Sequence, residues 1–147
     1  MVEVRAERAL KPAHVVRPMV NRDSQFFWDG TQLGELRIQK CNACGATRFP
    51  PGPACQSCEA YDRGYDVAAG TGTVFSYVVH RHPPVPGKEL PIVIALIDLD
   101  EGVRMVGEVV DAVPDGGGDA DIRIGMRLRV DFHRVDDDLT LPVWRTV

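Results

Sequence analysis

The four cysteines of this 147-residue chain all lie between positions 41 and 58. They form two Cys-x-x-Cys pairs, Cys41 with Cys44 and Cys55 with Cys58, with ten residues between the pairs. A pair with this spacing fits in one tight turn and can direct two thiolates at one ion, and two such turns make the four-sulfur tetrahedron that zinc prefers. Gly45 directly follows the first pair, where a chain that reverses around a metal often needs a positive φ. The spacing therefore predicts one zinc ion bound by all four cysteines.

Two alternatives to zinc are open at this point. The cysteines could form two disulfides, or one pair could act as a redox centre. We find no signal peptide in the sequence and therefore expect a cytoplasmic protein whose thiols stay reduced. No βαβ pattern surrounds either pair, which argues against a redox centre. Because four sulfur ligands leave no open coordination position, we expect a structural zinc that stabilises a segment too small to have its own core.

Charge is distributed unevenly along the chain. The net charge is −4, and it divides into +2 for residues 1–40, −1 for residues 41–70 and −5 for residues 71–147. Four thiolates around Zn²⁺ would add a further −2 to the middle segment. No segment carries the positive stripe that nucleic-acid binding needs, and no apolar run is long enough to span a membrane.

Residues 1–34 are expected to form an N-terminal arm with short helices. Residues 1–20 mix charges with two prolines and show no sustained period, so we assign no structure to them. A short helix should follow, capped by Asp23 or Ser24 and ended by Gly30.

Three consecutive aromatic residues, Phe26, Phe27 and Trp28, lie inside this expected helix. Consecutive helical positions are about 100° apart, so the three rings together cover roughly 200° of the helix surface. One flat neighbour cannot bury them all. Either two rings pack on the domain and one is exposed by chance, or the helix is clasped between the domain and something else.

The expected zinc ribbon spans residues 35–66. Residues 36–39 alternate between apolar and polar side chains, which predicts a strand that runs into the first cysteine pair. The segment Phe49-Pro50-Pro51 lies between the two pairs, where the prolines exclude a long helix. We expect Phe49 to be the apolar plug of the metal module. The alternative is that its ring faces a ligand.

The expected barrel spans residues 67–147. Strands are predicted at residues 73–80, 91–99, 103–110, 126–133 and 139–146. Both faces of the first are fairly apolar, as in a strand covered on both sides. Pro142 places the last strand at an edge. Five short strands with a long connection are typical of a small OB-fold Greek-key barrel, so the fold class is mainly β, and a β-sandwich is the competing hypothesis.

The motifs GELRIQKC, CGATRFPPGPAC, GTGTVFSY and IALIDLDEGVRMVGEV, in this order, resemble the thiolase-associated zinc-ribbon/OB-fold family. This family was long catalogued only as a domain of unknown function. The resemblance covers roughly residues 21–144 and implies an N-terminal helical segment, a rubredoxin-like zinc ribbon and an OB-fold barrel. It also implies a companion of acyl-CoA enzymes: thiolase-like enzymes, lipid-transfer-protein-type aldolases or hot-dog-fold hydratases, some in steroid side-chain degradation. The family often has a tryptophan after the last cysteine. Tyr65 is the expected substitute in packing the ribbon on the barrel.

No catalytic group stands out in the sequence. His80 and His82 flank Arg81 beside a proline-rich loop, but no serine or cysteine nucleophile accompanies them. His133 alternates to the outside of its strand. The residues thus predict a chain that does no chemistry alone. The resemblance further implies a non-catalytic accessory subunit of an acyl-CoA lyase or transferase complex, which positions the acyl-CoA or seals a partner's site. The alternatives are a zinc-ribbon/OB nucleic-acid module and an independent hydrolase acting through His80 or His82.

The predicted partner is a thiolase-like or aldolase subunit in a hetero-oligomer, with no nucleic acid and no membrane. The contact is predicted for the aromatic helix and the proline loop, namely Phe26, Phe27, Trp28, Phe49, Pro50 and Pro51. If coenzyme A reaches this chain, its phosphates need a nearby cation. By charge alone, the candidates are Arg48, Arg81 and Lys88.

Overall fold

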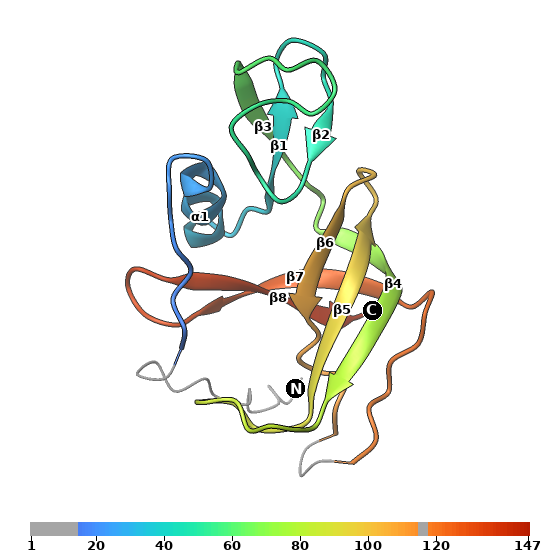
Figure 1. Cartoon of the computed structure of the whole chain (residues 1–147). Coiled ribbons are helices and arrows are strands. Elements are labelled where there is room, and N and C mark those ends of the chain that lie inside the picture. Colours follow the sequence, from blue (N-terminus) through green and yellow to red (C-terminus); the bar gives the residue numbers. More distant parts are fainter. Residues whose placement is uncertain (1–14, 115–117) are drawn as a thin grey trace.

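The computed structural model describes residues 15–114 and 118–147 (Figure 1). The first part of the predicted arm, before residue 15, lies outside these residues. Within them the chain forms one helix and eight strands: α1 (Gln25–Gln32), β1 (Arg37–Cys41), β2 (Thr47–Arg48), β3 (Arg63–Val67), β4 (Thr71–His80), β5 (Ile92–Leu99), β6 (Arg104–Glu108), β7 (Arg127–Arg134) and β8 (Thr140–Thr146). In the described segments, no helix is long and apolar enough to cross a membrane.

Helix α1 starts where the sequence predicts but continues past Gly30. Ser24 is its N-cap residue, without a side-chain capping bond, and the helix extends to Gln32. A Cβ at Gly30 would lie 2.7 Å from two side-chain carbons of Arg37, so this glycine permits close packing. The left-handed residue after the helix is Gly34, with a φ of 72°. The predicted end at Gly30 was wrong, because its glycine serves a contact and not a turn.

The strands form two antiparallel sheets. The smaller has the order β2-β1-β3, and the larger has the order β6-β5-β4-β7-β8. The larger sheet curls until its two outer strands approach, where Val109 forms a parallel bridge with Trp144 and the Val110 N–H donates to the Trp144 carbonyl at 2.9 Å. The result is a nearly closed five-stranded barrel, which confirms the OB-type prediction and excludes a sandwich of two sheets.

The barrel interior is apolar and closely packed. Val74, Ile97, Leu128 and Trp144 are at most 1% exposed. A Cβ at Gly107 would lie 2.2 Å from Cδ1 of Trp144, so β6 needs a glycine where the indole ring crosses it. The largest side chain of the core therefore depends on the smallest residue of the neighbouring strand.

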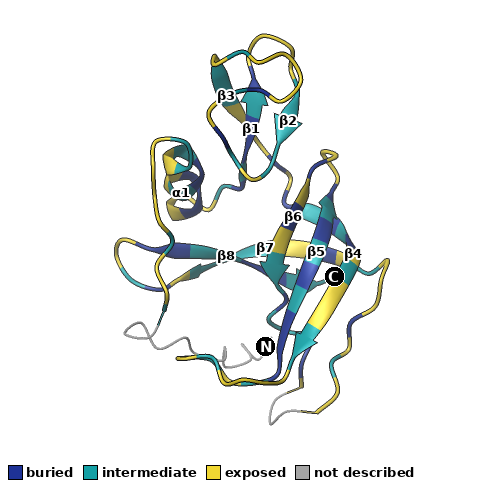
Figure 2. Cartoon of the chain, in the orientation of Figure 1, coloured by how far each residue is buried: buried dark blue, intermediate teal, exposed yellow. Residues whose placement is uncertain are grey.

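Strand β4 departs from its prediction on one face. Val74 on its inner face is 1% exposed, but Phe75 is 47% exposed and Val78 is 59% exposed. A β-bulge interrupts its pairing with β5 between Val74 and Ser76, so the residues before and after it alternate differently. The prediction that both faces are covered was wrong for the described chain, because no segment packs over this outer surface (Figure 2).

The turn between β5 and β6 bonds to neighbouring barrel strands and to the connection between β3 and β4. Asp100 receives two hydrogen bonds from Arg127, both 2.7 Å long, and one from the Thr71 hydroxyl at 2.5 Å. The neighbouring Glu101 accepts from the Ala69 backbone N–H at 2.7 Å. These carboxylates fix the short connection between the two sheets, so the acidic turn is structural.

Candidate metal centre and adjoining surface

The four cysteine sulfurs meet in one cluster at the end of the small sheet. All lie within 4.8 Å of one another, with the Sγ atoms of Cys41 and Cys58, and of Cys44 and Cys55, 3.6 Å apart. A tetrahedral zinc with bonds of about 2.3 Å places its sulfurs roughly 3.8 Å apart, whereas a disulfide needs about 2.05 Å. The geometry fits a four-cysteine zinc site and rejects the disulfide alternative. One structural zinc is thus the cofactor of this chain.

Two similar turns hold the ligands in place. In the first, the Gly45 N–H donates to the Cys41 carbonyl at 2.9 Å, and in the second, the Glu59 N–H donates to the Cys55 carbonyl at 3.0 Å. Gly45 has a φ of 77°, as predicted, and Glu59 occupies the equivalent position with a φ of 63°. Glu59 is the one non-glycine residue with positive φ in the described chain. The two turns that hold the cysteines therefore impose a positive φ, which non-glycine residues normally avoid.

The backbone favours ionisation of the cysteines, whereas their neighbouring sulfurs oppose it. Backbone N–H groups of Cys58 and Ser57 lower the pKa of the Cys55 thiol to about 6. For Cys58, the Ala60 backbone N–H lowers the pKa, but the neighbouring cysteine sulfurs raise it, and the result is about 12. Four adjacent thiolates repel one another, so a divalent cation is needed for all four to lose their protons together.

A buried glutamine on β1 connects the metal centre to the proline loop. Gln39 is 3% exposed, and its amide accepts from the Gly52 N–H at 2.8 Å and donates to the Gly52 carbonyl at 3.0 Å. Arg48 donates to the carbonyls of Pro50 and Ala54, at 3.2 and 2.9 Å. Side chains on two strands therefore fix residues 49–54 in one conformation. No sequence pattern pointed to Gln39, because its partner lies thirteen residues away.

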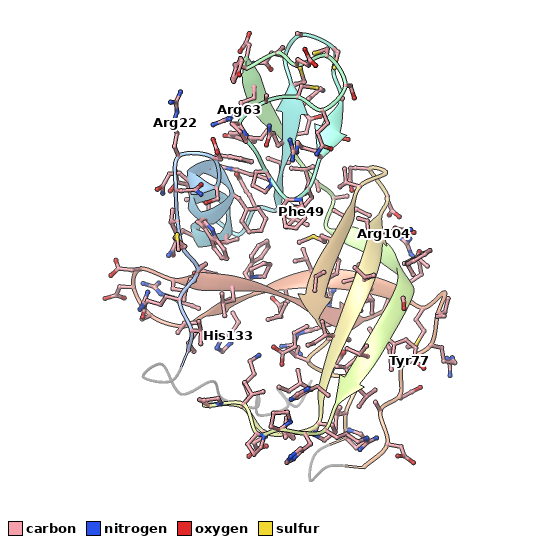
Figure 3. All side chains as sticks on the ribbon, viewed as in Figure 1. Arg22, Phe49, Arg63, Tyr77, Arg104 and His133 are labelled. Carbon is pink, nitrogen blue, oxygen red and sulfur yellow. The ribbon has the colours of Figure 1, made fainter. Side chains whose placement is uncertain are left out.

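A third side chain joins the same loop to the N-terminal segment. Arg63 on β3 donates to the Gly52 carbonyl at 3.0 Å and to the Pro53 carbonyl at 2.7 Å. It also forms an ion pair with Asp23, directly before α1. Figure 3 shows Arg63 beside the N-terminal turn, with Phe49 below it between the ribbon and the barrel.

Helix α1 lies between the ribbon and the barrel and contacts both. The Phe26 ring stacks on Tyr65 of β3, with centroids 5.7 Å apart, and Phe27 contacts Phe49 at 5.5 Å and Trp28 at 5.1 Å. Phe27 is 5% exposed, whereas Phe26 and Trp28 are half-buried. The second surface beside the helix is the chain's own ribbon, and Phe26 and Trp28 are covered only in part.

The ribbon differs from expectation at its third strand. The sequence pattern predicted no strand at β3, yet these residues pair with β1 along its full length. Tyr65 is 43% exposed and packs between Phe26 and the Arg37 guanidinium, which lies 4.5 Å from its ring centroid. Tyr65 thus attaches the ribbon to α1, and the predicted packing of Tyr65 on the barrel is corrected accordingly.

The three cations proposed for coenzyme A do not meet at one place. Arg48 lies on the ribbon, whereas Arg81 and Lys88 lie in the loop after β4, at the end of the barrel far from the ribbon (Figure 1). Arg81 pairs with Asp119 at 3.5 Å, and Lys88 pairs with Glu108. Lys88 is therefore already neutralised by a carboxylate, and of the three candidates Arg48 is the one beside the proline loop.

The described chain places His80 at the end of β4, His82 in the following loop and His133 on β7. His80 Nε2 lies 2.8 Å from the Pro83 carbonyl oxygen, and His82 is exposed in the same loop. His133 is half-buried on β7 (Figure 3). Because the four cysteines are gathered at the metal centre, none of them is placed near these rings.

Comparison with known proteins agrees with this architecture. The family model described as "ChsH2, rubredoxin-like zinc ribbon domain" matches residues 28–61, and "ChsH2, C-terminal OB-fold domain" matches residues 65–133. The chain belongs to the ChsH2 family. The family resemblance found in the sequence motifs is thereby confirmed.

Two curated relatives of this ChsH2-family chain are longer than the chain itself. It is 44% identical over 138 residues to the "Probable enoyl-CoA hydratase alpha subunit" of Thermomonospora curvata, covering 94% of this chain and 40% of that protein. It is 47% identical over 138 residues to the "3-oxo-4,17-pregnadiene-20-carboxyl-CoA hydratase alpha subunit" of Mycobacterium tuberculosis, covering 92% and 41%. The chain thus spans about two fifths of the length of these relatives.

A solved structure matches almost end to end. A chain of the "Ltp2-ChsH2(DUF35) aldolase" superposes with a TM-score of 0.80 at 45% identity, covering 88% of this chain and 98% of that one.

Proposed function

We propose that this ChsH2-family chain is a non-catalytic companion subunit of a thiolase-like or lipid-transfer-protein-type aldolase that acts on acyl-CoA substrates in steroid side-chain degradation. The observation that carries this proposal is the likeness to the aldolase chain, at 45% identity over 98% of its length. The steroid carboxyl-CoA substrate named for the M. tuberculosis relative supports the substrate class. Reduced thiols at the zinc suit the cytoplasm, where we place the complex.

The proposed contact is an aromatic–proline surface made by Phe26, Trp28, Phe49, Pro50 and Pro51. These residues are half-buried or exposed, whereas Phe27 lies beneath them and supports them from inside. The bonds from Gln39, Arg48 and Arg63 hold the loop before any partner arrives. A rigid surface loses little conformational entropy on binding, and half-buried aromatic rings are typical hot spots.

The proposed contribution to the reaction is orientation of the acyl-CoA and exclusion of water, with the bond-making groups in the partner. Arg48 suits a contact with a CoA phosphate, because it lies beside the proline loop and uses only part of its donor set on the Pro50 and Ala54 carbonyls. Arg81 and Lys88 lie at the other end of the barrel and would need a different contact.

A companion of a hot-dog-fold enoyl-CoA hydratase is the second candidate. The names of the two curated relatives favour it, since both are hydratase alpha subunits. The same aromatic–proline surface could serve either enzyme, so binding to the two enzymes must be compared directly.

The test is co-expression of the chain with each candidate enzyme, followed by measurement of affinity for wild type, Trp28→Ala and Tyr77→Ala. Tyr77 is an aromatic residue of β4, 37% exposed, and serves as the matched control away from the proposed contact. We expect Trp28→Ala to weaken aldolase binding at least tenfold, about 1.4 kcal/mol, and Tyr77→Ala to leave it unchanged.

Equal affinity of wild type and Trp28→Ala, with the zinc retained, would remove this surface from the contact. Preferential capture of the hydratase would select the second candidate. The isolated chain should show negligible aldolase, thiolase or thioesterase turnover. A substantial rate lost on His82→Ala would instead support a hydrolase.

A further inference from the structure

The outer face of strands β4, β5 and β6 is apolar and uncovered in the described chain. Val78 on β4 and Val106 on β6 are 59% and 58% exposed, and Phe75 is 47% exposed. Ile94 and Leu96 on β5 lie between them and are half-buried. We call these five residues the barrel outer face. A contiguous exposed apolar patch of this kind often marks an interaction site.

The strand register places opposite charges at the two ends of this face. Val106 pairs with Leu96, Arg104 pairs with Asp98, and Glu108 pairs with Ile94, so the three β6 residues point to the same side. Along β6 the outer row therefore reads positive, apolar, negative. Figure 3 shows Arg104 at the ribbon-facing end of the β5–β6 hairpin.

The charges at this face are balanced within the chain. Arg104 pairs with Asp98 at 2.6 Å and covers the Phe75 ring, with its guanidinium carbon 3.4 Å from the ring centroid. Glu108 pairs with Lys88. A face with an apolar centre and neutralised ends does not attract a polyanion such as nucleic acid, although OB folds often bind oligonucleotides on this side. The side chains of Arg104 and Glu108 remain 45% and 28% exposed, so each can take a second partner from an apolar surface that carries the same charges in reverse order.

We propose that the barrel outer face binds the same face of a second copy of this chain. The two-fold axis lies between the sheets, perpendicular to the strands, and passes over Val106. This rotation reverses the strand direction but keeps β6 opposite β6. Val106 then meets Val106 of the second copy, and each Arg104 faces the other copy's Glu108. Sheets that pack about 10 Å apart allow an arginine and a glutamate to reach one another.

The buried area of this contact is small, and the small area limits the affinity of the dimer. Stable interfaces bury about 800 Å² on each partner, more than five partly covered side chains can supply. The dimer is therefore weak and concentration-dependent. The barrel outer face shares no residue with the aromatic–proline surface, so this inference stands independently of the proposed enzyme partner.

The experiment is analytical ultracentrifugation of the full zinc-bound chain over a hundredfold range of concentration. We compare wild type, Val106→Lys and the matched control Val67→Lys. Val67 is a valine of β3, in the ribbon, and is 54% exposed. We expect a reversible monomer–dimer equilibrium in wild type, at least tenfold weaker in Val106→Lys and unchanged in Val67→Lys.

A charge exchange tests the two-fold arrangement itself. Arg104→Glu and Glu108→Arg should each weaken the dimer, because each puts like charges opposite one another across the axis. The double variant restores opposite charges between copies while leaving both intrachain pairs broken. Recovery of dimer in the double variant can therefore come only from the contact between copies. Thermal unfolding of each variant identifies any change caused by misfolding.

Three results would overturn the inference. The first is a wild type that stays monomeric up to a few hundred micromolar. The second is equal weakening by Val106→Lys and Val67→Lys. The third is loss of enzyme-partner binding in Val106→Lys with no change in self-association, which would assign this face to the partner. A failure of Trp28→Ala to affect enzyme binding would leave the dimer result untouched.

Discussion

The ribbon and the barrel of this chain are stabilised in different ways. The barrel buries a continuous set of large apolar side chains around Trp144, whereas the ribbon has three short strands and an outer strand, β3, with no fully buried residue. Four sulfurs replace the missing core. A metal can thus substitute for hydrophobic burial when a segment is too small to enclose enough side chains completely.

The two regions nevertheless share α1. Phe27 and Phe49 belong to the arm and the ribbon, yet they pack with residues of the barrel core cluster. Thr140 on β8 donates to the Gln32 side chain at 3.1 Å, which fixes the C-terminal end of the helix. The ribbon and the barrel therefore differ in what stabilises them. This difference can be tested by disrupting each region alone.

Replacing Cys44 by Ser should have the largest effect. Structural zinc in small modules contributes about 10 kcal/mol or more of apparent binding free energy at neutral pH, so loss of one ligand should unfold the ribbon. We expect zinc content to fall well below one per chain and ribbon amide signals to collapse in NMR spectra, while the β5 signals persist. Ser57→Ala, which lies between the two ligands of the second turn, is the control. Full zinc content in Cys44→Ser would contradict the four-cysteine site.

Gly107→Ala should disrupt the barrel alone. The added Cβ would lie 2.2 Å from Trp144, and overpacking of a close-packed core costs about 3 kcal/mol. We expect a lower free energy of unfolding by urea, followed by indole fluorescence, with unchanged zinc content. Val106→Ala, one residue earlier on the exposed side, should change stability by much less. A loss of zinc in Gly107→Ala would show that the regions unfold together.

The smallest effect is expected at the acidic turn between β5 and β6. Hydrogen bonds from Arg127 and Thr71 lower the pKa of Asp100 below its ordinary value of 3.8. A carboxylate with a lowered folded-state pKa stabilises the fold above its ordinary pKa, and that contribution disappears as the pH falls through the folded value. The stability difference between wild type and Asp100→Asn should therefore be constant from pH 5 to 7 and shrink below about pH 4.

Acid also releases zinc, so this experiment needs a matched variant. Asp119→Asn removes an exposed carboxylate from the barrel without touching the turn and should lose zinc over the same pH range. Subtracting its unfolding curve isolates Asp100. A difference that persists unchanged to about pH 3 would show that Asp100 acts through packing and not through its charge.

Short-range patterns predicted most of the fold. The cysteine spacing identified the metal ligands. Apolar runs bounded by turns, and two-residue alternation at residues 126–133, located the five barrel strands. Pro142 was correctly assigned to an edge strand. Strand β3 was missed because none of its residues is fully buried, so its sequence shows no alternation of apolar and polar side chains.

The missed parts of the site depend on contacts that are distant in sequence. Phe26 meets Tyr65 across 39 positions, and Arg63 meets Asp23 across 40. No periodic pattern encodes such pairs, since each is decided by how the ribbon folds back over the helix. The Asp100 carboxylate of the β5–β6 turn binds Arg127 and Thr71, and these partners could be identified only from the folded chain.

Gln39 links the conformation of the proline loop to the strand that carries a metal ligand. Gln39 precedes the ligand Cys41 by two residues on β1, and its amide holds Gly52 of the proline loop. A chain without metal would lose the strand and the loop conformation together. Loss of zinc would then also remove the proposed aromatic–proline contact, so metal supply would decide whether this surface exists.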